Sequence, residues 1–219
     1  MYSITIGLKK MNSTIIENYL DELYKNPRCE LNYNKDYELL IAVVLSAQTT
    51  DKRVNQVTEI LFKKYDTLEK LRDADLEDIK EIIKPIGTFN KKSVFIKEIA
   101  KYLIDNCYSK VPNDEKLLTK IPGVGRKTSN VVRSNLFNYP AIAVDTHVTR
   151  VSKRLNLAKE KDDVTTIEKK LMKIFPKESW SKLHHQMVLF GRYRCTAARP
   201  MCNDCKLKEI CKYYKNNNK

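Results

Sequence analysis

The sequence predicts an all-α protein, and three observations lead to that prediction. Apolar residues make up 42% of the 219 residues, which is enough for a sizeable core. Glycine occurs only five times, whereas sandwiches, barrels and Rossmann-type folds need more glycine for their turns. Apolar residues recur with the 3.6-residue period of a helix, and no convincing pair of strands is found. The longest apolar run, Leu39–Leu45, is far too short for a membrane span, and we expect no signal peptide.

The first half of the chain begins its helical pattern at Ser13, with one apolar face that continues to Tyr24. The segment Glu38–Gln48 is apolar nearly all round, which predicts a central buried helix rather than a surface helix. Asp51 and Asp75 are each expected to cap the helix that follows, because a short acidic side chain accepts bonds from first-turn amides.

The second half continues in the same way, with a helix of about fifteen residues around Val94–Leu103 and a short helix from Asn113 to Lys120. Further helices are expected at Arg126–Asn138, Asp145–Leu155, Val164–Phe175 and Ser179–Arg192, for about ten in all. We expect two helical domains: a helical barrel over 28–140 that contains the hairpin described below, and a discontinuous domain made of 1–27 and 141–219. The ends, 1–10 and 215–219, are expected to fray.

The charge balance indicates a polyanionic partner. The chain has 41 Lys and Arg against 27 Asp and Glu, a formal net charge of +14. A globular protein this basic usually binds nucleic acid. The alternative is a lysine-rich composition that only keeps the protein in solution.

Four of the six cysteines fall within 17 residues and predict a four-thiolate site. Their spacing has six, two and five intervening residues: Cys195, Cys202, Cys205 and Cys211. This spacing is neither the two close pairs of a zinc ribbon nor a ferredoxin pattern. Without a secretory signal it indicates a metal or cluster site rather than a disulfide framework. Cys29 and Cys107 fit no ligand spacing and are expected to be buried, inert thiols.

A tight turn with two glycines separates two predicted helices and is followed directly by basic residues. Gly123 and Gly125 allow a close approach of the backbone to a ligand, and Arg126 and Lys127 open the next helix. Backbone amides at a helix N-terminus favour phosphate, so the turn predicts a grip on a phosphate that does not depend on base identity. The alternative is an ordinary helical hairpin in which the glycines serve only steric needs.

Several motifs in the correct order resemble the endonuclease III family of helix–hairpin–helix DNA glycosylases. The hairpin Ile-Pro-Gly-Val-Gly-Arg-Lys-Thr at 121–128 resembles that family's helix–hairpin–helix, and Ala143–Val148 resembles the segment that completes its signature. Further matches are Leu39–Asp51 with its Ser46-Ala47-Gln48 end, His184-His185, Phe190-Gly191-Arg192-Tyr193 and the cysteine cluster. The resemblance runs from about residue 13 to residue 214.

The resemblance implies a bifunctional DNA glycosylase and abasic-site lyase that acts on oxidised pyrimidines in double-stranded DNA. By matching motif, Lys127 is the nucleophile, Asp145 is its carboxylate partner and the four cysteines hold a [4Fe-4S] cluster. A lysine nucleophile needs its neutral amine, which the positive end of a helix and the neighbouring Arg126 favour. The plainer alternatives are that Lys127 only binds phosphate and that Asp145 only caps the helix that follows it.

Chemistry at a stacked nucleotide requires that it be flipped out of the duplex and the gap be filled. The family's gap-filling glutamine corresponds to Gln48, whose alternative role is a helix-terminal residue that touches only solvent. The segment Ile86–Asn90 resembles a second wedge loop of the family, but Thr88 stands where a large apolar residue is usual. Phe89 either shares the wedging or packs in the core.

The cysteine loop also carries basic residues that are expected to meet phosphate, foremost Arg199 and Lys206. We expect a monomer in the cytoplasm of a prokaryote, associated with the nucleoid and with no membrane contact. Two rival functions stay open. One is a monofunctional mismatch or adenine glycosylase that activates water with the aspartate alone. Such relatives generally have no lysine at the position of Lys127, so Lys127 argues against this rival. The other is a non-catalytic iron–sulfur DNA-binding protein, against which the pair of Lys127 and Asp145 argues.

Overall fold

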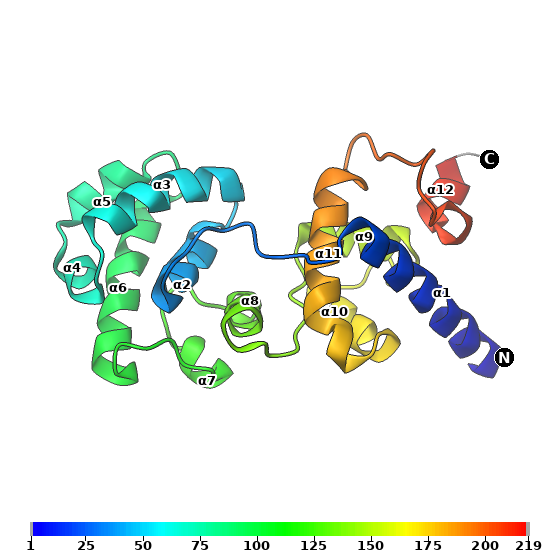
Figure 1. The fold of residues 1–219 in the computed structure, drawn as a ribbon, viewed down its shortest axis with the longest axis horizontal. Helices are drawn as coiled ribbons and strands as arrows, with labels where there is room; N and C mark the ends of the chain where they lie inside the picture. The colour runs from blue at the N-terminus through cyan, green and yellow to red at the C-terminus, as the bar shows by residue number, and fades with distance from the viewer. Residues whose placement is uncertain (1, 218–219) are drawn as a thin grey trace. The chain divides into compact units, whose positions relative to one another are not determined.

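The computed structural model describes the backbone of residues 2–217 and the side chains of residues 11–217. Over that range it contains twelve α-helices, two short 3-10 helices and no strand (Figure 1), which confirms the predicted all-α class. None of the described helices is both long and apolar enough to cross a membrane. Backbone contacts divide the chain into a discontinuous unit, Met1–Arg28 with Pro140–Lys219, and a continuous unit, Cys29–Tyr139.

The continuous unit is built around the buried helix α2 (Asp36–Leu45), in which every residue from Glu38 to Leu45 is buried. This confirms the predicted central helix. Figure 1 shows α2 between three longer helices, and α2 contacts each of them: α3 (Asp51–Lys64), α6 (Phe89–Cys107) and α8 (Arg126–Phe137). The shorter helices complete the unit: α4 (Leu68–Asp73) and α5 (Leu76–Ile83) on α6, and α7 (Glu115–Leu118) beside α8.

Helix caps in this unit follow the predicted chemistry but not always the predicted residue. Asp75 caps α5 as expected, accepting bonds from two first-turn amides. The cap of α3 is Thr50 rather than Asp51, because Thr50 has the extended backbone of a cap and Asp51 already lies in the first turn. The cap of α7 is Asp114 rather than Asn113, whose side chain instead accepts a bond from the Arg133 side chain.

The discontinuous unit has a core formed where α11 packs on α9 and α1 packs on α10 and α11. Its elements are α1 (Tyr2–Leu23), α9 (Thr146–Arg154), α10 (Val164–Ile174), η1 (Lys177–Ser179), α11 (Trp180–Tyr193), η2 (Lys208–Ile210) and α12 (Lys212–Asn217). Helix α1 begins at Tyr2, well before the apolar face that predicted it, and the expected fraying of 1–10 stays a prediction. Residues 215–217 belong to α12, while Met1 and 218–219 lie outside the described residues.

Candidate active site

The hairpin before α8 depends on one glycine for its shape. Gly123 has a φ of +83°, in the left-handed region that side chains rarely adopt. A Cβ at this position would lie 2.6 Å from Cδ2 of Phe95, which approaches from α6. The turn is closed by the Val124 amide, which donates to the Ile121 carbonyl over 3.0 Å. Gly123 is therefore required by the fold itself.

Gly125 has no such requirement within the protein. Its backbone is extended, with φ −94° and ψ 179°, and a Cβ there would meet nothing within 4 Å. It is the N-cap residue of α8 and offers no side chain to the first-turn amides. Those amides have no partner inside a helix and carry the positive end of its dipole. The missing side chain therefore leaves open space at an anion-attracting helix end.

Lys127 occupies the first turn of α8 and is exposed. The opposite face of α8 is fixed by the buried residues Ser129, Asn130 and Val132. Nη1 of Arg126 lies 3.9 Å from Oε1 of Glu115, and the other carboxylate oxygen, Oε2, lies 3.5 Å from Nη1 of Arg133. The charge of Arg126 is thus partly balanced by Glu115.

Asp145 is the N-cap residue of α9, and its Oδ1 accepts a bond from the Val148 amide over 2.7 Å. The capping role weighed in the sequence is therefore confirmed, and only one carboxylate oxygen is used in it. The preceding segment, 141–144, is buried, and its packing fixes the backbone that leads into the half-buried Asp145. Asp145 belongs to the discontinuous unit and Lys127 to the continuous unit.

Gln48 and Thr88 are both exposed and both adopt the left-handed backbone conformation, with φ values of +57° and +58°. Gln48 lies beyond α2, which ends at Leu45, three residues before the predicted end. A left-handed conformation is uncommon for non-glycine residues and exceptional for a β-branched one such as Thr88. Strain of this kind persists only where the surrounding structure enforces it. Phe89, in contrast, is half-buried and packs against the core.

The cysteine loop gathers its four thiols around one cavity, which Phe190 and Tyr213 also line: Cys195, Cys202, Cys205 and Cys211. Burial is the main reason why the pKa of the thiol is raised at Cys202, Cys205 and Cys211. No three His, Cys, Asp or Glu side chains among the described residues are grouped to bind one ion. Of the two remaining cysteines, Cys107 is buried as expected, but Cys29 is only half-buried because it lies where the chain enters the continuous unit.

Two arginines of α9 bind this loop, and the sequence analysis did not single them out. The Arg154 guanidinium donates to the carbonyls of Thr196 and Ala197 at 2.7 and 3.0 Å, and Nη1 lies 3.3 Å from Cys195 Sγ. Arg150 donates to the carbonyls of Gly191 and Cys195 at 2.6 and 3.1 Å. The sequence signal that could have identified them is their four-residue spacing, which places both arginines on one face of the helix. The loop is thereby fixed to the helix that Asp145 caps.

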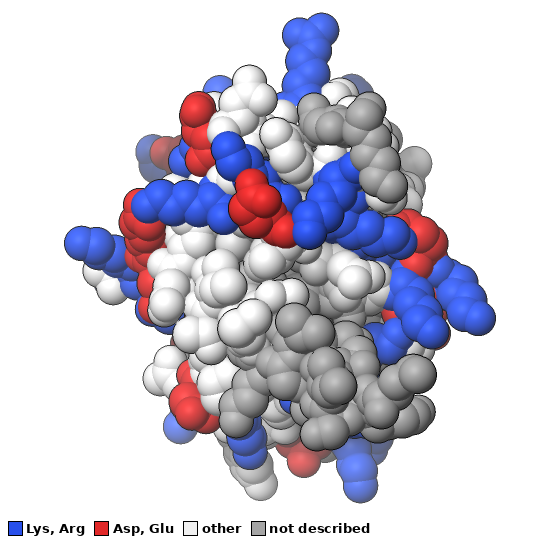
Figure 2. Space-filling view, turned by 90° about the vertical axis from the view of Figure 1, so that its right-hand side faces the viewer, with Lys and Arg blue, Asp and Glu red and all other residues white. Residues whose placement is uncertain are grey.

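Most of the net charge resides in the discontinuous unit, which has 22 Lys and Arg against 11 Asp and Glu. The continuous unit has 19 against 16. Figure 2 shows Lys and Arg side chains spread over the upper half of one face, with acidic side chains among them. Arg199 is exposed, whereas the exposed Lys206 forms an ion pair with Glu22 at 2.6 Å. That pair competes with any phosphate for the charge of Lys206.

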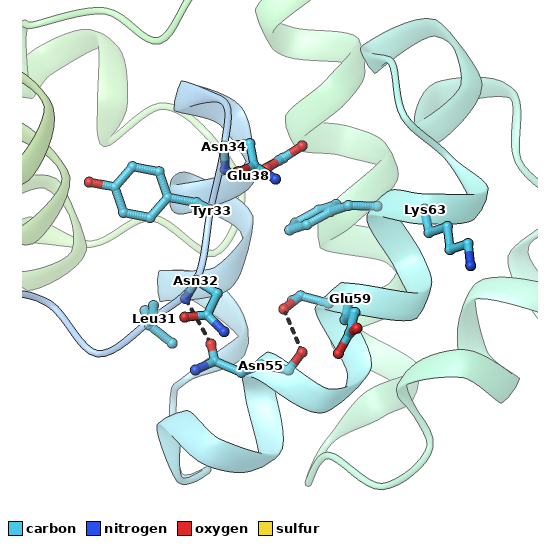
Figure 3. Close-up of a pocket in the computed structure, with 10 residues that line it drawn as sticks. Leu31, Asn32, Tyr33, Asn34, Glu38, Asn55, Glu59 and Lys63 are labelled. Atoms are coloured by element: carbon cyan, nitrogen blue, oxygen red, sulfur yellow. Dashed lines mark hydrogen bonds between the residues drawn. The ribbon is translucent and has the colours of Figure 1, made fainter.

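A separate cavity of about 570 Å³ lies between residues 31–34 and α3 (Figure 3). Several of its polar groups form hydrogen bonds within the fold itself. The Asn55 side chain accepts from the Asn32 amide and donates to the Glu30 carbonyl, at 2.9 and 2.8 Å. The buried Glu38 carboxylate accepts from the Asn34 amide over 2.7 Å. These contacts fix the entry of the chain into α2, and we assign no ligand to the cavity.

Comparison with known proteins places the chain in a family. Residues 41–177 match the model of the HhH-GPD superfamily base excision DNA repair proteins. Endonuclease III of Bacillus subtilis is 46% identical over 205 residues, which is 92% of this chain and 94% of that protein. Endonuclease III of Escherichia coli K12 is 41% identical over 194 residues, 89% of this chain and 92% of that protein.

Solved structures agree with this placement. A trapped covalent intermediate of an endonuclease III with DNA has a TM-score of 0.92 at 46% identity, covering 96% of this chain and 99% of that one. A thermostable thymine-DNA glycosylase, at 23% identity and a TM-score of 0.84, shares the fold over 94% of this chain and 98% of that one. The chain therefore belongs to the HhH-GPD superfamily of base excision DNA repair proteins, and it is a bifunctional DNA glycosylase and lyase of the endonuclease III type.

Proposed function

We propose that Lys127 is the nucleophile of this enzyme and that Asp145 is its carboxylate partner. The observation that carries the proposal is the exposed amine of Lys127 in the first turn of α8, directly after a glycine that leaves open space for a phosphate. A phosphate held at that helix end would bring its own sugar close to the amine. A relative that is 46% identical has been solved as a trapped covalent intermediate with DNA, which supports a covalent step.

The amine of Lys127 attacks C1′ of the damaged nucleotide, and the bond from C1′ to the base breaks. The base leaves with the bonding electron pair and takes up a proton, and the amine loses one proton. When the sugar ring then opens, O4′ takes up a proton and C1′ becomes the carbon of a protonated Schiff base. Loss of the C2′ proton then drives β-elimination, which breaks the bond from C3′ to its phosphate. Asp145 accepts the proton of the amine and stabilises the positive charge that develops at C1′. Water releases the Schiff base and regenerates the lysine.

We propose oxidised pyrimidines in double-stranded DNA as the substrate, with Gln48 and Thr88 as the residues that open the duplex. The exposed amide of Gln48 offers both donors and an acceptor to the base left without a partner. Thr88 is too small to wedge between bases as a large apolar residue would, so its contact is with the edge of the opposite strand. Phe89 packs against the core, which supports a role for it in the core rather than in this task.

The DNA backbone is gripped in two places in this proposal, and a monomer suffices for both. The amides of Gly123 and Gly125 and the guanidinium of Arg126 bind phosphate near the lesion. Arg199 binds phosphate from the cysteine loop, with a smaller contribution from Lys206 because Glu22 is already its partner. The concentration of positive charge in the discontinuous unit supports the second contact.

We propose that the cofactor is a [4Fe-4S] cluster held by Cys195, Cys202, Cys205 and Cys211. The four soft donors fit it, because such a cluster takes one thiolate per iron and does not need three of them around a single ion. The cation of Arg154 beside Cys195 Sγ suits the negative charge of four thiolates. When bound, the cluster cross-links a loop that has no core of its own and takes no part in bond breaking.

Borohydride trapping on an abasic-site duplex tests the proposed nucleophile. Lys127→Gln is expected to abolish the trapped adduct and strand cleavage while retaining most DNA affinity, because the hairpin amides remain. Lys120→Gln is the matched control, since Lys120 is an exposed lysine of the same hairpin. A trapped adduct with Lys127→Gln would place the nucleophile elsewhere. If the adduct disappears only together with DNA binding, Lys127 is a phosphate ligand instead.

A further inference from the structure

Lys92 is a buried lysine that neither the motifs nor the proposed chemistry uses. Its residue is only 4% exposed, in the first turns of α6. The ammonium donates to the carbonyls of Leu45 and Ala47 over 2.9 and 2.7 Å and lies 3.3 Å from the Thr49 hydroxyl. These three acceptors match the three donors of an ammonium group.

The acceptors of Lys92 are neutral oxygens at one place, the end of α2 and the turn that follows it. The last carbonyls of a helix have no partner within the helix and carry the negative end of its dipole. A buried ammonium satisfies them and gains their field, although burial lowers the pKa of Lys92. Burying a charged group costs free energy, and this cost indicates that the fold requires the turn after α2 to be held in place.

The turn that Lys92 holds is the turn that carries Gln48. Ala47 and Thr49, its two neighbours, both contact the Lys92 ammonium, and the Gln48 side chain between them is exposed. At the other end of the same residue, the Lys92 amide donates to the Thr88 carbonyl over 3.1 Å. One residue therefore binds the turn on both sides of Gln48, at Ala47 and Thr49, and also the backbone carbonyl of Thr88.

We propose that Lys92 is the positioning residue of the duplex-opening device, and that it holds Gln48 and Thr88 at a fixed separation as one two-pronged element. This inference rests on the proposed roles of Gln48 and Thr88. Gap filling requires Gln48 to occupy a narrow space at the moment when the base leaves the stack, and a turn that is not held would spend much of its time elsewhere. Lys92 itself does not touch the DNA.

Lys92→Met tests the proposal, because methionine keeps the length and apolar stem but removes the three donors. The matched control is Lys97→Met. Lys97 lies on the same helix as Lys92, and its ammonium also binds a backbone carbonyl, that of Ala74, which is far along the chain from Gln48. Two measurements are compared in single turnover: excision of an oxidised pyrimidine from a duplex, and borohydride trapping on a single-stranded abasic oligonucleotide. The second needs Lys127 but has no opposite strand to part.

Lys92→Met is expected to slow duplex excision at least tenfold and to change single-strand trapping less than twofold, while Lys97→Met changes neither. Thr49→Val removes only one acceptor and is expected to show the same pattern at a few-fold, should Lys92→Met fold poorly. Equal losses on both substrates would mean a merely structural role for Lys92 and would overturn the proposal. Unchanged duplex excision in both Lys92→Met and Thr49→Val would also overturn it.

Gln48→Ala separates failure of this inference from failure of the proposed function. If Gln48→Ala leaves duplex excision unchanged, the gap-filling role is wrong and the positioning role of Lys92 is lost with it. If Gln48→Ala is impaired and Lys92→Met is not, only the positioning role is wrong. The double variant is expected to be no slower than the slower single variant, because both changes remove the same element. Multiplied losses would show that the two residues act independently.

Discussion

Alanine is expected to affect different properties at the two hairpin glycines. At Gly123 it lowers the stability of the fold, and at Gly125 it lowers the affinity for DNA. Gly123→Ala forces a side chain into the left-handed region, which costs roughly 1–2 kcal/mol, and presses a methyl group against Phe95, which adds on the order of 1 kcal/mol. The total of about 2–3 kcal/mol lowers the Tm by about 4–12 °C for a chain of this size.

Gly125→Ala meets neither obstacle, because its backbone is extended and the added methyl group enters open space. Loss of glycine as an N-cap costs under about 1 kcal/mol, and the less flexible unfolded chain offsets part of that. Bound phosphate, however, would be held away from the helix amides by the methyl group. A hydrogen bond to a charged group contributes about 1.5–3 kcal/mol, so the affinity for DNA is expected to fall roughly tenfold to a hundredfold.

The assay measures thermal unfolding and equilibrium binding to an abasic duplex for both variants, at one fixed salt concentration. Gly123→Ala should lose stability, and Gly125→Ala should lose affinity with a nearly unchanged Tm. Wild-type affinity in Gly125→Ala would refute the reasoning that phosphate occupies this space. A drop in Tm as large as that of Gly123→Ala would refute the reasoning that the fold does not need this glycine.

The remaining predictions concern charge and the cysteine loop. Asp145→Asn keeps a side-chain oxygen that accepts from the Val148 amide, so the Tm of this variant should barely change. Its rate of base excision in single turnover should fall about 10²–10⁴-fold, and its rate of abasic-site cleavage should fall less. A wild-type excision rate would leave Asp145 with the capping role alone. Arg154→Met removes the bonds to Thr196 and Ala197 and should lower both the Tm and the iron bound per chain, and an unchanged iron content would contradict the anchoring role. In a plot of the logarithm of DNA affinity against the logarithm of salt concentration, the slope should be about −0.9 per phosphate neutralised. Arg199→Ala should reduce the magnitude of this slope by about one, and Lys206→Ala should reduce it by less, because Lys206 already pairs with Glu22. Equal effects of the two variants would show that the pair of Lys206 and Glu22 breaks when DNA binds.

The sequence by itself determined those features that depend on residues close together in the chain. A helical period and few glycines were sufficient for the all-α class, and an unbroken apolar segment was sufficient to predict the buried helix α2. Four cysteines in 17 residues predicted the shared cavity of the thiols. Helix caps were predicted only in part, because the choice between adjacent residues such as Thr50 and Asp51 depends on which one has the extended backbone.

Only the tertiary structure decided what each residue of the site does for its surroundings. The two hairpin glycines are equivalent in the sequence, and Phe95 of another helix makes Gly123 indispensable while Gly125 stays open. Lys92 lies 47 residues beyond the carbonyl that it binds at Leu45, and Arg154 lies 41 residues before the thiol beside it. Contacts at such separations leave no periodic trace in the chain, because they are created when helices pack and not when they form.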